Sequence, residues 1–174
     1  MTTIQLLQKT KAAWPALSAA PAEEKNRLLL AMADALEAHI PAILAANAQD
    51  MTDAEGHISA VMLDRLRLDG SRVRAMADGV RAAAALPDHT GRALAQFTRP
   101  NGMTITKVQV PLGLVAIIYE SRPNVTSDAA ALTVKSGNVC MLRSGKEAYR
   151  SCHAIVDALK DGITAAGGDP DIVN

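Results

Sequence analysis

Aromatic residues are nearly absent from this chain of 174 residues, which has one tryptophan, two tyrosines and one phenylalanine. Because 49% of the residues are still hydrophobic, alanine and aliphatic side chains have to build the core. Such a core favours helices that pack closely on each other or on a sheet. The length is sufficient for one full domain, or for part of a larger protein.

Cysteine and histidine are also sparse. Cys140 lies in an apolar, strand-like run and Cys152 in a helical pattern, which is too few and too differently placed for a disulfide framework or a zinc knuckle. We therefore interpret both as reduced, buried thiols. The four histidines are scattered without any pairing, so we expect no metal site.

The chain has no excess of charge of either sign, with 18 basic and 18 acidic residues. No basic cluster large enough for nucleic acid or an anionic membrane appears. The N-terminus lacks a basic segment followed by an apolar run, and no stretch of about 18 uncharged apolar residues occurs anywhere. These absences predict a cytoplasmic protein with no nucleic-acid or membrane partner.

Helical patterns fill the first half of the chain. Pro21, followed by two glutamates, predicts a helix start, because proline's missing N–H costs nothing in the first turn and carboxylates favour that end of the helix dipole. Pro41 starts another helix that runs to Gly56 as its C-terminal cap. A third helical pattern over 71–86 ends before Pro87.

Alternating and apolar patterns replace the helical ones in the second half. Asn-Gly at 101–102 lies between two alternating runs and predicts a β-hairpin over 93–110. Two mostly apolar strands follow, over 111–120 and 138–143, separated by a helix from about 123 to 135 and followed by a long helix. This order indicates a parallel sheet covered on both faces. The sequence ends at DPDIVN, where a third strand is expected to begin, so we expect an incomplete sheet.

Two segments carry a resemblance to a known family. PLGLVAIIYESRPNVTSDAAALTVKSGNVCMLRSGKEAYRS and VMLDRLRLDGSRVRAMADGVRAAAALPD resemble γ-glutamyl phosphate reductases of the aldehyde dehydrogenase superfamily, and the likeness extends over essentially the whole chain. It implies an α/β fold: N-terminal helices, a β-hairpin, and the start of a doubly wound parallel-sheet cofactor domain. The implied parts are a helical part of the cofactor domain (1–92), an oligomerisation hairpin (93–110) and the first βαβα units of the NADP-binding domain (111–174).

The resemblance also implies an activity. Members of the family use NADPH to reduce L-glutamyl 5-phosphate to L-glutamate 5-semialdehyde in proline biosynthesis, releasing phosphate through attack by a cysteine thiolate. That cysteine lies beyond Asn174 in the family, and neither Cys140 nor Cys152 matches it. The chain therefore resembles an N-terminal fragment that lacks its nucleophile, and we expect it to be inactive alone and to form a homo-oligomer when complete.

Candidate cofactor residues follow the second apolar strand. The resemblance places Arg143 where the superfamily has a lysine that contacts the adenosine ribose, with Ser144, Gly145 and Lys146 opening the next helix. Two cations at the carboxyl end of a parallel strand suit a ribose 2′-phosphate, although without the resemblance Arg143 alone is better interpreted as a solvated charge at the strand end. Glu147 is a candidate for a ribose hydroxyl, or simply a first-turn acid. The sequence has no G-x-G-x-x-G fingerprint, as in this superfamily.

The turn in IYESRPNVTSDAAALTVKSG contains the candidate catalytic residue. The resemblance implies that the side chain of Asn124 donates to the oxyanion of the intermediate, and the alternative is that Asn124 caps the following helix. Arg122 is a candidate for the substrate's phosphate or carboxylate, or for a salt bridge to Glu120. Two other interpretations of the whole chain stay open: a non-catalytic nucleotide-binding or assembly module, and the start of a reductase region in a bifunctional synthase.

Overall fold

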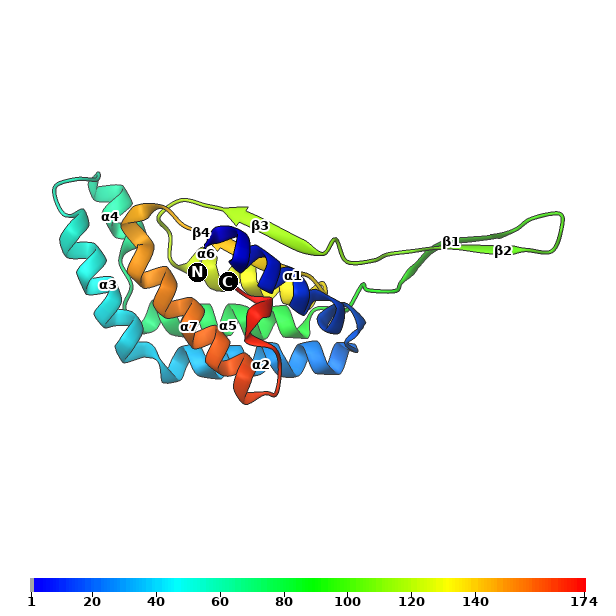
Figure 1. Cartoon of the computed structure of the whole chain (residues 1–174). Coiled ribbons are helices and arrows are strands. Elements are labelled where there is room, and N and C mark those ends of the chain that lie inside the picture. The colour runs from blue at the N-terminus through cyan, green and yellow to red at the C-terminus, as the bar shows by residue number, and fades with distance from the viewer. Residues whose placement is uncertain (1) are drawn as a thin grey trace.

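The computed structural model describes residues 2–174, and it consists of a helical body from which a long β-hairpin protrudes (Figure 1). The helices are α1 (Thr3–Ala19), α2 (Ala22–Ala38), α3 (Ile40–Ala54), α4 (Ala60–Leu66), α5 (Gly70–Ala85), α6 (Asn124–Lys135) and α7 (Tyr149–Ala165), with 3-10 turns η1 (Lys146–Ala148) and η2 (Pro170–Ile172). The strands are β1 (Ala93–Thr98), β2 (Thr104–Val108), β3 (Leu114–Ile118) and β4 (Val139–Arg143).

The predicted helices of the first half form, and two more accompany them. Pro21 precedes α2, a proline lies in the first turn of α3, and Gly56 after α3 has the left-handed φ of +77° that a C-terminal glycine cap adopts. The patterns described above did not predict α1 or α4. Thr2 and Gln5 start α1 with a reciprocal capping box, and Ser59 caps α4 by accepting from the N–H of Met62.

An apolar core joins both halves of the chain. Helix α2 packs against α5 on one side and α7 on the other, and fully buried Met32, Leu36, Val80 and Ile155 belong to one continuous cluster. Gly162 allows α7 to lie directly on α2, because a Cβ at this position would stand 2.5 Å from the carbonyl oxygen of Ala31. The core therefore consists of alanine and aliphatic side chains, as the composition predicts.

The sheet of the body is small and parallel. β3 pairs with β4 in a register that runs from Leu114 opposite Val139 to Ile118 opposite Arg143. The expected third strand begins as a single parallel bridge between Cys140 and Val173. The expectation that the sheet is covered on both faces holds at the start of β3, where Leu114 packs against the core, but is wrong at its end, where Ile118 is 79% exposed.

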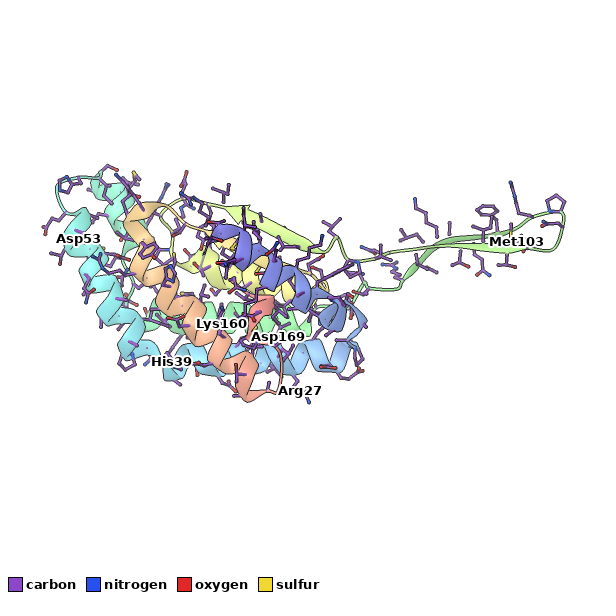
Figure 2. All side chains as sticks on the ribbon, viewed as in Figure 1. Arg27, His39, Asp53, Met103, Lys160 and Asp169 are labelled. Carbon is purple, nitrogen blue, oxygen red and sulfur yellow. The ribbon has the colours of Figure 1, made fainter. Side chains whose placement is uncertain are left out.

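The hairpin of β1 and β2 confirms the Asn-Gly signal. Thr98 pairs with Thr104, so the connection comprises residues 99–103, and Gly102 takes a φ of +85° inside it. All of β1 and nearly all of β2 are exposed, and the hairpin extends away from the helices with Met103 near its far end (Figure 2). The division of the chain at residues 92 and 110 into parts stays a prediction.

Within residues 2–174, no single helix has both the length and the apolar character to cross a membrane; only α2 and α3 taken together reach that length, and the pair is bent by 66°.

Candidate functional site

The turn after β3 places Asn124 at the start of a helix without using its side chain. Helix α6 begins at Asn124 itself, its N-cap is Pro123 in a helical conformation, and no side chain caps it. Instead the N–H groups of Val125 and Thr126 donate to the carbonyl oxygens of Arg122 and Pro123, each at 3.1 Å. The alternative in which Asn124 caps the helix is therefore wrong.

The side-chain amide of Asn124 is available to a ligand. Asn124 is exposed and lines a cavity of 590 Å³ together with residues of α4 and α5. Among residues 2–174 the side-chain amide of Asn124 forms no hydrogen bond. Its backbone carbonyl oxygen accepts from Ser127 Oγ at 2.9 Å. A neutral donor held rigidly at a helix start, with nothing to donate to, matches the requirement of an oxyanion site.

Arg122 lines the same cavity. Its Nε lies 3.7 Å from Glu120 Oε2, so the ion pair considered from the sequence exists, but the distance is longer than a hydrogen bond. Arg122 Nε is buried and has no hydrogen-bond partner among the described residues. The guanidinium group is therefore able to bind an anion, because its ion pair with Glu120 does not use its hydrogen-bond donors.

Further charged residues of this cavity were not singled out in the sequence. Arg72 donates from Nη1 to the carbonyl oxygens of Asp64 and Arg67 at 2.6 and 2.7 Å, and from Nη2 to Asp64 Oδ1 at 3.1 Å. These bonds hold the loop between α4 and α5, and Arg65 at the end of α4 and Arg67 in the loop both line the cavity. The repeated arginines of LDRLRLDGSR were the available signal, but only the tertiary fold shows that they face Asn124.

A second cavity, of 320 Å³, lies at the carboxyl end of β4. Arg143, Ser144 and Lys146 line it, so three of the five candidate cofactor residues share one site. Arg143 and Lys146 are exposed and form no ion pair within residues 2–174. The sequence reasoning missed Tyr149 and His153, which also line this cavity with ring centroids 4.4 Å apart; their i, i+4 spacing on one helix was the signal.

Glu147 and Gly145 connect the two strand-end loops. Ser121, after β3, donates from Oγ to Glu147 Oε2 at 2.6 Å, and this hydrogen bond lowers the pKa of the Glu147 carboxyl group. A Cβ on Gly145 would lie 2.2 Å from Ser121 Oγ, so only glycine allows this approach. Glu147 therefore already has a partner, and the loop of the cofactor candidates is held against the turn that carries Asn124.

The expectation that Ser144, Gly145 and Lys146 open the next helix is wrong. Residues 146–148 form the 3-10 turn η1, and α7 begins only at Tyr149. The N–H groups of Arg150 and Ser151 are not free for a ligand, because Asp50 of α3 accepts both, at 3.3 and 2.7 Å. The carboxylate of Asp50 thus occupies the N-terminus of α7, where the sequence predicted an anion of the cofactor.

Comparison with known proteins identifies the family. No protein-family model matches the chain. The γ-glutamyl phosphate reductase of Neisseria meningitidis serogroup C (strain 053442) is 57% identical over 169 residues, which cover 97% of this chain and 40% of that protein. The crystal structure of γ-glutamyl phosphate reductase from Thermotoga maritima matches with a TM-score of 0.95 at 34% identity, covering 98% of this chain and 42% of that one. The chain belongs to the γ-glutamyl phosphate reductase family.

The wider fold is that of aldehyde dehydrogenases. A salicylaldehyde dehydrogenase from Pseudomonas putida G7, 21% identical, has a TM-score of 0.69 over 99% of this chain and 34% of that one. The predicted fold class, an aldehyde dehydrogenase-like α/β arrangement, is confirmed. The chain spans about two-fifths of the length of the curated γ-glutamyl phosphate reductases it matches.

Both cysteines of the chain are buried, as predicted. Burial raises the pKa of the Cys140 thiol to about 11, so at neutral pH this sulfur is protonated and a poor nucleophile. Cys152 lines the cavity that contains Arg143 and not the one that contains Asn124. Neither thiol is placed beside the candidate oxyanion donor.

Proposed function

We propose that this chain forms the oxyanion and cofactor side of a γ-glutamyl phosphate reductase, an oxidoreductase of proline biosynthesis. The reaction is the reduction of L-glutamyl 5-phosphate to L-glutamate 5-semialdehyde with release of phosphate. The family membership supports the substrate, and two cavities at adjacent strand ends support a site where an acyl group meets a cofactor. The cytoplasmic location and the lack of nucleic-acid and membrane partners remain predictions.

The unpartnered amide of Asn124 is the observation that carries this proposal. When a thiolate adds to the acyl carbon, negative charge develops on the carbonyl oxygen, and a fixed neutral N–H stabilises that charge without needing to reorganise. Asn124 meets this description because α6 holds its backbone and none of the described residues uses its Nδ2. Arg122, beside it, is suited to the leaving phosphate through a guanidinium group with a buried, unpartnered Nε.

The cavity at the end of β4 fits the adenosine end of NADP. Arg143 and Lys146 offer two unpaired cations for a 2′-phosphate, and the rings of Tyr149 and His153 form an aromatic wall beside them. A volume of 320 Å³ is enough for part of a dinucleotide. The cofactor supplies hydride to the acyl carbon. Glu147 acts here as a positioning residue that holds Gly145 and Ser121 together.

The test is the reverse reaction of the complete reductase that contains this segment. We expect NADPH to form from L-glutamate 5-semialdehyde and NADP, and only when inorganic phosphate is present, because phosphate has to release the acyl group from the enzyme. The 174-residue chain alone should show no turnover, since both of its thiols are buried. Oxidation that proceeds equally well without phosphate would contradict the acyl-phosphate assignment. No turnover by the complete protein would favour a non-catalytic nucleotide-binding or assembly module.

A further inference from the structure

The cavity beside Asn124 contains a second polar side chain of α6. Asp128 follows Asn124 by one turn of α6 and lines the same 590 Å³ cavity. Within residues 2–174 its carboxylate forms neither a hydrogen bond nor an ion pair, and burial raises the pKa of the group. Asp128 is exposed at the surface of this cavity, so its carboxylate is open to a ligand there.

The charges around the cavity are unequal in sign. The cavity is lined by four arginines and two aspartates. Asp64 and Arg72 form an ion pair, with Arg72 Nη2 at 3.1 Å from Asp64 Oδ1. The groups that remain without a hydrogen-bond partner inside the described chain are three guanidinium groups and one carboxylate: Arg65, Arg67, Arg122 and Asp128. A ligand matched to this surface carries several negative charges and a single positive one.

A γ-glutamyl phosphate has this distribution of charge. Its phosphate and its α-carboxylate are negative, and its α-ammonium is its only cation. Four bonds of about 1.5 Å separate the acyl carbon from the ammonium nitrogen, so an extended substrate spans about 5 Å between them. Side chains four residues apart on a helix stand about 5 to 6 Å apart. Asn124 and Asp128 are therefore spaced to hold the two ends of this segment of the substrate.

We propose that Asp128 binds the α-ammonium group of the substrate while Asn124 holds the acyl oxygen. The spacing of these two residues on α6 then selects an amino acid over its deaminated analogue. This inference rests on the proposed function. The three guanidinium groups supply the positive charge for the carboxylate and phosphate.

The experiment compares two aldehydes in the phosphate-dependent reverse reaction of the complete reductase. L-Glutamate 5-semialdehyde carries the α-ammonium, and 5-oxopentanoate is the same chain without it. For Asp128→Asn we expect KM for the first aldehyde to rise about 10- to 100-fold, as for loss of a charge-assisted hydrogen bond, with kcat within a few-fold. For 5-oxopentanoate KM should stay the same. Asp128→Glu, which keeps the charge, should restore most of the discrimination.

A matched control is Asp157→Asn, which removes an exposed carboxylate of α7 outside the cavity and should change neither KM. Equal losses on both aldehydes in Asp128→Asn would overturn the inference, because a structural role affects both alike. A parent enzyme that uses both aldehydes equally well would overturn it too. If the parent oxidises neither aldehyde with phosphate, the proposed function itself fails, and this outcome is separate from the other two.

Discussion

At the scale of single residues, sequence and structure agree where the chemistry is local. The strand, turn and helix that carry Asn124 follow from neighbouring residues, and so does the grouping of Arg143 and Lys146 at a strand end. Partners from distant parts of the chain were not foreseen. Glu147 binds Ser121, and Asp50 occupies the start of α7, because long-range contacts leave no periodic trace in the sequence.

Arg143 gives a prediction about cofactor preference. If its guanidinium group contacts the 2′-phosphate, Arg143→Ala in the complete reductase should weaken binding of NADPH by about 1.5 to 3 kcal/mol and leave NADH nearly unchanged. Isothermal titration with each cofactor measures both affinities. Arg74→Ala, on the exposed side of α5, is the control. An equal loss for the two cofactors would mean that Arg143 has only a structural role.

At the scale of elements, two buried lysines hold α2 and α6 to the end of α5. Lys25 Nζ is fully buried and lies 2.5 Å from Asp88 Oδ2, just before the hairpin. Lys135 Nζ donates to Asn26 Oδ1 at 2.6 Å and to the carbonyl oxygen of Ala84 at 2.7 Å. The sequence predicted the helices but not these links, because lysine in a helical pattern normally indicates a solvent-facing position.

The pair of Lys25 and Asp88 predicts a dependence of stability on acid. Burial raises the pKa of Asp88, but its bonds to Lys25 and Thr90 outweigh burial and hold the pKa below the ordinary 3.8. The stabilisation is therefore complete above pH 3.8 and is lost as the pH falls through the lower folded value. Asp88→Asn should cost about 3 to 5 kcal/mol of unfolding free energy at neutral pH, because it leaves a buried ammonium unpaired.

Urea denaturation at neutral pH and in acid measures this effect. The double variant Lys25→Met, Asp88→Asn is the control and should recover most of the lost stability, since no buried charge remains. A single variant as stable as the parent chain would show that water reaches Lys25.

The hairpin predicts self-association. A two-stranded hairpin is marginal in water on its own, and β1 exposes half of the surface of Leu94 and Phe97. We expect a second copy of the chain to pair with this edge, giving dimers or larger species in light scattering. Phe97→Lys should shift the chain towards monomer, whereas Leu30→Lys, equally exposed on α2, should not. A monodisperse monomer of the parent chain at high concentration would contradict this expectation.

At the scale of the whole molecule, two cavities lie at neighbouring strand ends. The hydrogen bond between Ser121 and Glu147 connects the loops that line them. The resemblance in sequence predicted the family and the fold class, since both are encoded in contiguous motifs. The arginine-lined wall opposite Asn124 was not predicted, because α4, α5 and α6 meet there from separate parts of the chain.

Steady-state kinetics of the complete reductase carrying Asn124→Asp tests the central claim, that Asn124 is the oxyanion donor. Aspartate keeps the size of the side chain, and in the first turn of α6 it suits the helix dipole, so thermal stability should not fall. Its charge opposes the oxyanion, so kcat should fall about 10²- to 10³-fold. Asn101→Asp in the hairpin turn should leave kcat unchanged. A kcat for Asn124→Asp within a few-fold of the parent would contradict the account.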